Sequence, residues 1–151
     1  MKIALERPDQ PDVVALIDDL DAYQRSLYPA ESCYLLDLNA LLQPEVLFAV
    51  ARDGQGRAVG CAALVLGELY GELKRMYVHP AARGQGVAQG LLACLEGHAM
   101  DAGCPRLMLE TGPSQPEALR LYERAGFERR GPFGSYRDDP FSVFMHKPLA
   151  V

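Results

Sequence analysis

The sequence predicts an α/β (α+β) protein with a mixed, mostly antiparallel central sheet and helices on both faces. Two-residue and 3.6-residue apolar spacings alternate along the chain in the order β-α-α-β-β-β-α-β-α-β-β. A strand-helix-strand pattern over 72–111 predicts a right-handed parallel crossover. A turn at 53–56 joins two apolar strands as a hairpin. With 151 residues, the chain fits a single domain, 1–151.

The first half of the chain predicts three strands and two helices. The expected elements are strand 2–7, helix 11–27, a short helix at 36–42, and strands 46–52 and 58–66. Asp9 or Asp12 is expected to cap the first helix, because short acidic side chains accept bonds from first-turn amides. Strand 58–66 is apolar on both faces and is therefore expected at the centre of the sheet.

The second half predicts the crossover and two closing strands. The expected elements are strand 72–78, a helix from about 84 to 102, strand 107–111, a helix opened by Pro116, and strands 127–129 and 142–146. Alternation along the first of these strands predicts two faces, with Leu73, Arg75 and Tyr77 on one and Glu72, Lys74, Met76 and Val78 on the other.

Composition excludes several classes of protein. A net charge of −5 argues against a nucleic-acid-binding protein, which needs a basic surface. The start lacks the apolar run of a signal peptide, and no stretch is long enough to cross a bilayer, so we expect a cytoplasmic protein with no membrane partner. The four cysteines, Cys33, Cys61, Cys94 and Cys104, lack metal-ligand spacing. We expect them to be reduced, with Cys61 and Cys94 in the core and no metal bound.

A glycine-rich loop between a strand and a helix is the most informative segment. It reads Arg83, Gly84, Gln85, Gly86, Val87, Ala88. The first turn of a helix has unpaired N–H groups and the positive end of the helix dipole, which together bind anions. The loop lacks the Gly-Lys-Ser/Thr of a P-loop and the spacing of a dinucleotide fingerprint. Taken alone, it is equally consistent with a turn that merely needs flexible residues.

Three motifs in order resemble the GNAT superfamily of N-acetyltransferases. The first is Arg/Gln-x-x-Gly-x-Gly/Ala, met by Arg83, Gly86 and Ala88; the second is strand 107–111; the third is Ala118-x-x-Leu121-Tyr122-x-x-Ala125-Gly126-Phe127. They cover about half of the chain, and its segments 112–118 and 131–145 resemble those of a bacterial subgroup.

The resemblance implies acetyl-CoA as co-substrate and a splayed pair of parallel strands, 72–78 and 107–111. It places the pantetheine along Met76, Tyr77 and Val78 and the pyrophosphate on the loop amides. Gln115 stands where many members have a cofactor-contacting Asn.

Acetyl transfer to an amine requires a proton acceptor, oxyanion donors and stabilisation of the departing thiolate. Tyr122 matches the tyrosine that serves the leaving group in the family, although its spacing also suits a core aromatic. Glu72 is the expected base, by analogy with some members; a surface carboxylate at a strand end is the alternative, and Glu110 is a rival. An amide near Tyr77 is the expected oxyanion donor.

The acceptor is expected to be the amine of a small molecule or of a peptide. Glu31, Asp138 or Asp139 could attract its ammonium group, and Tyr28 or Tyr136 could flank it, whereas Arg75 and Arg137 suit an acceptor that carries a carboxylate. A homodimer is left open. The first competing hypothesis is a non-catalytic acyl-CoA-binding sensor, over which retention of Tyr122 and Glu72 favours the enzyme. The second is a structural protein with a vestigial loop, which predicts no CoA binding at all.

Overall fold

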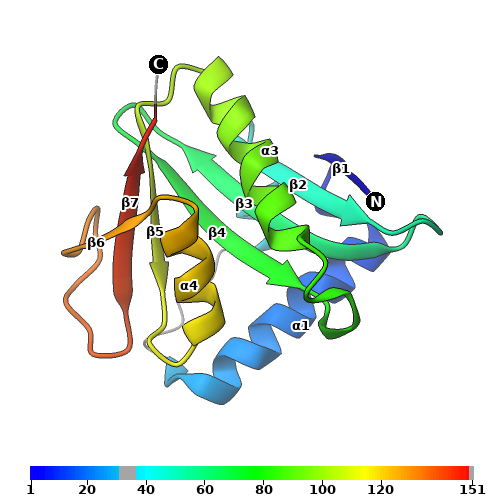
Figure 1. Ribbon diagram of the computed structural model, residues 1–151, viewed down its shortest axis with the longest axis horizontal. Coiled ribbons are helices and arrows are strands. Elements are labelled where there is room, and N and C mark those ends of the chain that lie inside the picture. The colour runs from blue at the N-terminus through cyan, green and yellow to red at the C-terminus, as the bar shows by residue number, and fades with distance from the viewer. Residues whose placement is uncertain (31–36, 150–151) are drawn as a thin grey trace.

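A computed structural model describes residues 1–30 and 37–149 of the chain (Figure 1). Its strands are β1 (Lys2–Leu5), β2 (Val46–Arg52), β3 (Ala58–Leu66), β4 (Gly71–Val78), β5 (Arg106–Thr111), β6 (Glu128–Arg130) and β7 (Val143–Pro148). Its helices are α1 (Pro11–Leu27), α2 (Leu38–Leu41), the 3-10 turn η2 (Pro80–Ala82), α3 (Val87–Asp101) and α4 (Pro116–Arg124). The order of these elements is the one expected from the sequence.

The strands form one seven-stranded sheet in the order β1-β2-β3-β4-β5-β7-β6. Every neighbouring pair is antiparallel except β4 and β5, which are parallel. This parallel pairing covers only residues 71–73 of β4 and 107–109 of β5. Both strands continue beyond it, β4 to Val78 and β5 to Thr111. The expected mixed sheet with a splayed parallel pair is therefore confirmed.

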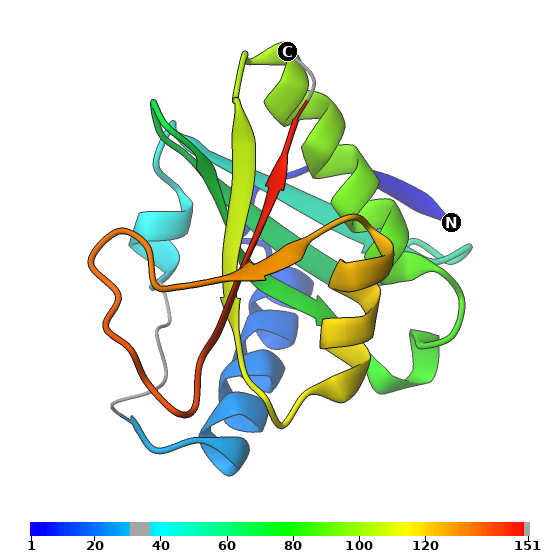
Figure 2. The same cartoon turned by 60° about the vertical axis from the view of Figure 1, so that its left-hand side comes forward.

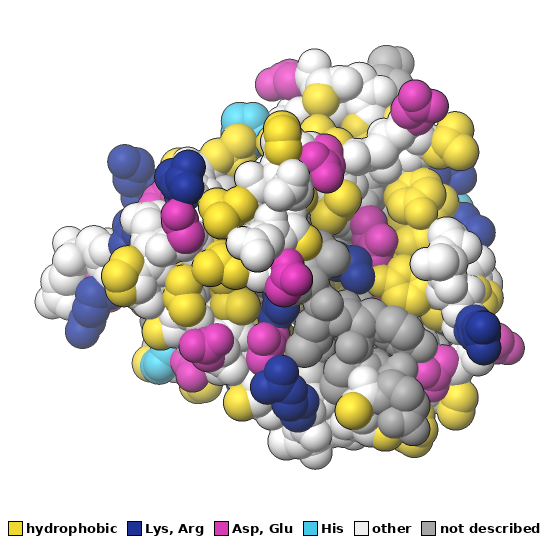
Figure 3. Space-filling view, turned by 180° about the vertical axis from the view of Figure 1, so that it is seen from behind, with side chains coloured by type: hydrophobic (Ala, Val, Ile, Leu, Met, Phe, Trp, Pro, Cys, Tyr) yellow, Lys and Arg dark blue, Asp and Glu magenta, His cyan; other side chains and the backbone are white. Residues whose placement is uncertain are grey.

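Helices cover both faces of the sheet (Figures 1 and 2). The larger core lies between the sheet and helices α3 and α4, and includes Leu64, Leu91 and Leu107. A second core lies beneath α1 on the opposite face, where Val13 and Phe48 pack together. That face, seen in Figure 3, carries acidic and basic side chains interspersed with apolar ones. The described side chains of this face therefore do not form the continuous basic patch typical of nucleic-acid binding.

Strand β4 contains a β-bulge at Arg75. Cys61 of β3 lies opposite Tyr77, and Ala63 lies opposite Lys74, so two residues of β4 face one residue of β3. Arg75 has a φ of 59°, in the left-handed region, and is the one non-glycine residue with positive φ in the part of the chain that the structure describes. An extra residue of this kind bends its strand and shifts the alternation of the side chains that follow.

The bulge reverses the expected faces of β4 beyond residue 74. Leu73 packs in the α3 core, whereas Tyr77 packs beneath α1. Met76 and Val78 lie against the same core as Leu73. The prediction that Leu73 and Tyr77 share one face, with Met76 and Val78 on the other, was wrong, because one inserted residue moves every later side chain to the opposite face.

The expected acidic cap of α1 was also wrong. The N-cap residue is Gln10, whose side chain makes no capping bond. Asp9 instead pairs with Arg7 at 2.8 Å, and Asp12, inside the first turn, pairs with Arg52 of β2 at 2.7 Å. Both carboxylates therefore pair with arginine side chains, and neither residue occupies the N-cap position of the helix.

The described residues contain no helix long and apolar enough to cross a membrane. Within 1–30 and 37–149, no group of three or more His, Cys, Asp or Glu side chains has the arrangement of a metal site. Cys61 and Cys104 are buried and reduced, and Cys94 is half-buried and reduced. Cys33 lies outside the described residues.

Arg52 of β2 connects the segment after β1 to the first turn of α1 through its guanidinium group. It bonds to both carboxylate oxygens of Glu6, to Asp12 and to the Gly56 carbonyl. These contacts lower the pKa of Glu6 and of Asp12, chiefly through the hydrogen bonds from Arg52. The side chains of Arg52 and Glu6 are 18% and 22% exposed, so solvent screens their attraction only in part.

We predict that Arg52→Met lowers the free energy of unfolding by about 1–2 kcal/mol at pH 7. A carboxylate with a lowered pKa stabilises the fold above its unfolded pKa, and this contribution is lost as the pH falls through its folded pKa. The deficit of the variant should therefore shrink between pH 5 and pH 3. Urea unfolding of both proteins across that range measures it. A deficit that does not change with pH would show that lost packing, rather than the ion pairs, is responsible.

Candidate active site

The divergence of β4 and β5 opens a cleft of about 670 Å³ between α1, α3 and α4. Its walls come from the ends of β4 and β5, from the loop before α3, from the first turns of α4 and from one side of α1. Met76, Tyr77 and Val78 line it, as do Arg83, Gly84, Gly86, Val87, Ala88, Gln115 and Tyr122. The cleft therefore brings together all the residues expected to contact the cofactor except Gln85, which lies exposed within the same loop.

The loop before α3 turns through two left-handed glycines. Gly84 has a φ of 79° and Gly86, the N-cap of the helix, a φ of 77°. Other residues adopt this conformation with strain, so it explains glycine at both positions. The helix begins at Val87, three residues later than expected, because these glycines are not helical. The bond from the Gly90 amide to the Gly86 carbonyl, at 3.0 Å, closes its first turn.

This geometry leaves the first amides of α3 at the edge of the cleft. The N–H groups that precede Gly90 in the first turn have no carbonyl within the helix to bond. Arg83 adds a positive charge beside them. Its Nε donates to the Val78 carbonyl at 3.2 Å, and its guanidinium lies 6.0 Å from the centre of the Tyr77 ring. The loop can therefore bind a diphosphate by main-chain donors, the helix dipole and one guanidinium group.

Tyr122 belongs both to the cleft and to the core. Its side chain is 6% exposed, and its ring packs edge-on against Phe127 at 5.7 Å between centres. Burial raises the pKa of its phenol well above the usual value. The phenol therefore stays protonated at neutral pH, as a hydrogen-bond donor must. The core and functional interpretations of Tyr122 are compatible, since the ring packs on one side while the residue also lines the cleft.

The two candidate bases occupy different surroundings. Glu110 on β5 lines the cleft, and burial raises its pKa to about 7. The Ser142 hydroxyl donates to Glu110 Oε2 at 2.8 Å. Glu72 does not contribute to the lining; it accepts a bond of 2.5 Å from the Tyr136 hydroxyl, and Lys74 Nζ lies 3.5 Å away. Sequence reasoning gave no weight to Lys74 or Ser142, because nothing in their local pattern distinguishes them from ordinary strand residues.

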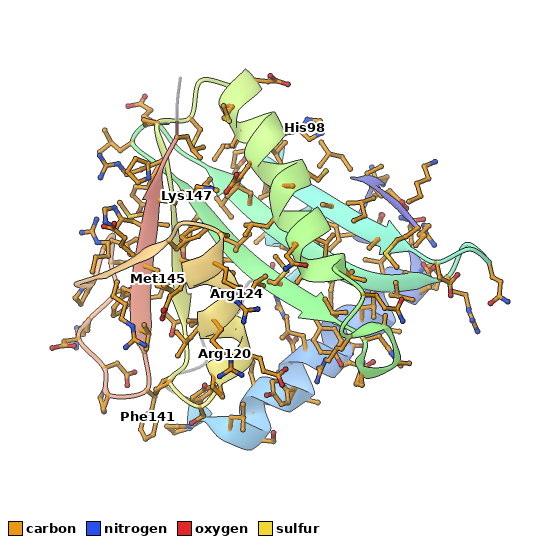
Figure 4. The ribbon with its side chains drawn as sticks, viewed as in Figure 1. His98, Arg120, Arg124, Phe141, Met145 and Lys147 are labelled. Carbon is orange, nitrogen blue, oxygen red and sulfur yellow. The ribbon has the colours of Figure 1, made fainter. Side chains whose placement is uncertain are left out.

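Several of the residues expected around an acceptor contact other parts of the protein. Tyr28 is buried and its hydroxyl donates to Gln115 Oε1 at 3.2 Å, so the amide that replaces the family's Asn also holds α1. Phe141, labelled in Figure 4, lies edge-on to the Tyr28 ring with 6.4 Å between the ring centres. Asp139 bonds to the Phe141 amide at 2.8 Å, as a turn residue does. Arg137 and Asp138 are exposed. Glu31 lies outside the described residues.

Comparison with known proteins identifies the family. The profile of the Acetyltransferase (GNAT) family matches residues 13–127. The chain is 50% identical over 149 residues to an IAA acetyltransferase of Azospirillum brasilense, covering 97% of each chain. It is 37% identical to an uncharacterized N-acetyltransferase of Bacillus subtilis, covering 99% of this chain and 100% of that one. A Klebsiella pneumoniae crystal structure described as an acyl-CoA N-acyltransferase aligns with a TM-score of 0.84 at 41% identity, covering 99% and 97% of the two chains.

We predict that Ser142→Ala raises the pKa of Glu110 above about 7, because the hydroxyl bond favours the charged carboxylate while burial opposes it. Carbon-13 NMR of the glutamate carboxyl groups, titrated from pH 4 to 9, follows this group directly. Ser135→Ala, at an exposed position of the same connection, serves as the control. A pKa that falls or stays constant in Ser142→Ala would show that the hydroxyl does not stabilise the carboxylate.

Proposed function

The chain belongs to the GNAT family of acetyltransferases, which transfer an acyl group from acyl-CoA to an acceptor, and from this we propose that it acetylates a primary amine by direct attack on acetyl-CoA. One observation carries the proposal. A single cleft contains a loop suited to a diphosphate, a protonated phenol and a carboxyl group whose pKa is about 7. These are the groups that amine acetylation needs.

We place acetyl-CoA along the splayed strands. The register of β4 with β5 ends at residue 73, and Met76, Tyr77 and Val78 line the cleft beyond it, so the pantetheine amides can bond to these three residues as an added strand would. The pyrophosphate then reaches the amides of residues 84–88 and Arg83. Gln115 at the start of α4 faces the same cleft and is proposed to contact the cofactor. An amide of β4 near Tyr77 is the proposed oxyanion donor.

Tyr122 is proposed to stabilise the departing thiolate of coenzyme A. A free thiol has a pKa of about 8.5, far below that of the buried phenol, so complete proton transfer from Tyr122 is unfavourable. A hydrogen bond from the phenol to the developing thiolate is favourable in the same setting, because it joins a neutral donor to a charge in a poorly solvated cleft. We therefore assign Tyr122 the role of thiolate stabiliser.

We propose Glu110 as the group that accepts the proton of the amine. Its pKa of about 7 leaves the carboxylate substantially available at neutral pH and basic enough to accept a proton. The negative charge of Glu72 contributes to the raised pKa of Glu110, and Lys74 opposes it. Glu72, the base expected from the sequence, remains the rival and can act through Tyr136, to which it is bonded.

Direct attack is favoured over an acyl-enzyme intermediate by the lining of the cleft. A covalent route would need an activated nucleophile such as a thiolate beside the thioester. None of the described residues that line the cleft is a cysteine. Cys61 is fully buried, and burial raises the pKa of its thiol to about 12, so this thiol stays protonated and unreactive. The amine is therefore proposed to attack acetyl-CoA in a ternary complex.

The proposed function is tested by offering a panel of amines together with acetyl-CoA and measuring the thiol released. We expect turnover with at least one amine, and Tyr122→Phe should lower kcat by about 10–100-fold, the equivalent of one hydrogen bond to a charged group. Tyr23→Phe, another tyrosine on the cleft wall, is the matched control and should leave kcat unchanged. Coenzyme A binding without transfer to any amine would instead support a sensor.

The pH dependence of kcat distinguishes the two carboxylates. If Glu110 is the base, kcat of the wild type falls as the pH drops below about 7, because the carboxylate takes up a proton. The Glu110→Gln variant should lose most of the activity, and its remaining kcat should no longer fall on the acidic side of the pH profile, here called the acidic limb. Glu72→Gln should keep the limb but move it to lower pH, since it removes a neighbouring negative charge. A lost limb in Glu72→Gln and a retained one in Glu110→Gln would assign the base to Glu72.

A further inference from the structure

We propose that Arg75 is a positioning residue for the acyl transfer, and that its ion pair with Asp21 of α1 holds the β4 bulge in the conformation that presents main-chain amides to the thioester. This inference rests on the proposed function, because it concerns how the oxyanion donors of that reaction are oriented. It assigns to Arg75 neither contact with the cofactor nor a role in binding the acceptor.

The backbone of Arg75 requires a partner. A long, unbranched L-residue at a φ of 59° is disfavoured relative to extended conformations, and the surrounding structure has to impose it. Glycine or asparagine adopts this conformation far more readily, and neither stands here. The conformation matters for the site, because the bulge redirects β4 immediately after its last parallel pair with β5, at Leu73.

The side chain of Arg75 supplies this constraint. Its guanidinium pairs with the Asp21 carboxylate, and the two side chains are 4% and 16% exposed. Burial lowers the pKa of Arg75, while Asp18 on the same helix favours its charged form. A buried cation paired with a carboxylate resists movement, because separating them would leave a charge unpaired in a poorly solvated place. The pair therefore ties the bulge to α1.

The main chain of the bulge is held as well. The Cys61 thiol of β3 donates to the Arg75 carbonyl at 3.6 Å. A bulge interrupts the regular ladder, so this carbonyl takes a side-chain donor from the neighbouring strand. Arg75 is therefore fixed at both its side chain and its carbonyl group. Met76 and Tyr77 follow Arg75 in the cleft wall, so the fixed conformation of Arg75 determines how their main chain is oriented.

The ion pair also joins two walls of the cleft. Leu20, Tyr23 and Gln24 of α1 line the cleft, and Asp21 lies among them in the helix. A shift of α1 would therefore be transmitted to the β4 amides through Asp21 and Arg75. This is the structural basis for treating Arg75 as a residue that acts through its neighbours.

Isotope-edited infrared spectroscopy of bound acetyl-CoA, labelled with carbon-13 at the thioester carbonyl, tests the proposal without any acceptor. In the wild type, oxyanion donors should shift the carbonyl band to lower frequency than in solution. Arg75→Leu and Asp21→Asn should return the band of the bound thioester toward its solution position and lower kcat by about 100-fold, as loss of one oxyanion donor does. Arg75→Gly should keep most of the shift, because glycine adopts the left-handed conformation without a partner.

The rescue by glycine separates positioning from direct contact. If the band in Arg75→Gly returns to its solution position as in Arg75→Leu, the guanidinium itself acts on the thioester and the proposal is overturned. It is equally overturned if Arg75→Leu and Asp21→Asn retain the wild-type band. If Arg75→Leu does not fold, the carbonyl bands of Asp21→Asn and Arg75→Gly still test the proposal. Failure of the wild type to bind acetyl-CoA would refute the proposed function instead.

A matched control removes another ion pair of the same kind away from the cleft. Lys147 of β7, labelled in Figure 4, pairs with Glu96 of α3 at 2.7 Å, and the two side chains are 25% and 20% exposed. Neither residue lines the cleft. Glu96→Gln should therefore change the stability of the protein without moving the carbonyl band. A band that moves equally in this variant would indicate a general loss of packing and would also overturn the proposal.

Discussion

The architecture of the site depends on where β4 and β5 stop pairing. Parallel strands that stayed together would satisfy each other's main-chain groups and leave no slot between them. Here they pair at three positions and then separate, with the bulge at Arg75 bending β4 just beyond the last pair. The separation exposes main-chain donors and acceptors to the cleft, and the crossover then delivers the N-terminus of α3 to one end of it. The separation of β4 from β5 thus provides a slot for the pantetheine, and the crossover to α3 provides a binding site for the diphosphate at one end of that slot.

Much of the fold could be predicted from local sequence. The order of the elements, the crossover and the glycine loop follow from residues that act near their own position, such as Gly86 at the start of α3 and Pro116 at the start of α4. These signals are strong because a left-handed φ or a missing N–H restricts the choice of residue wherever it occurs. The family resemblance then connected the loop to Tyr122, and both line the same cleft.

The remaining features depend on contacts between distant residues. No periodicity in β4 predicts that an arginine will adopt a left-handed conformation, since the residue that holds it, Asp21, lies 54 positions earlier in α1. Glu72 and Glu110 are both carboxylates at strand ends in the sequence, and only their surroundings differ. Burial raises the pKa of Glu110 although the hydrogen bond from Ser142 opposes the shift, whereas Glu72 lies outside the cleft lining and accepts a hydrogen bond from Tyr136. Such distinctions arise in tertiary packing and cannot be derived from spacing.

The central claim is that coenzyme A lies in the slot between β4 and β5 with its pyrophosphate on the first turn of α3. Titration of nitrogen-15-labelled protein with coenzyme A, followed by amide NMR, tests it most directly. The account predicts large, saturable shifts for the amides of residues 76–78 and 84–88, and small shifts for the hairpin at 53–56. Shifts confined to residues outside the cleft, or no saturable shifts at all, would contradict it.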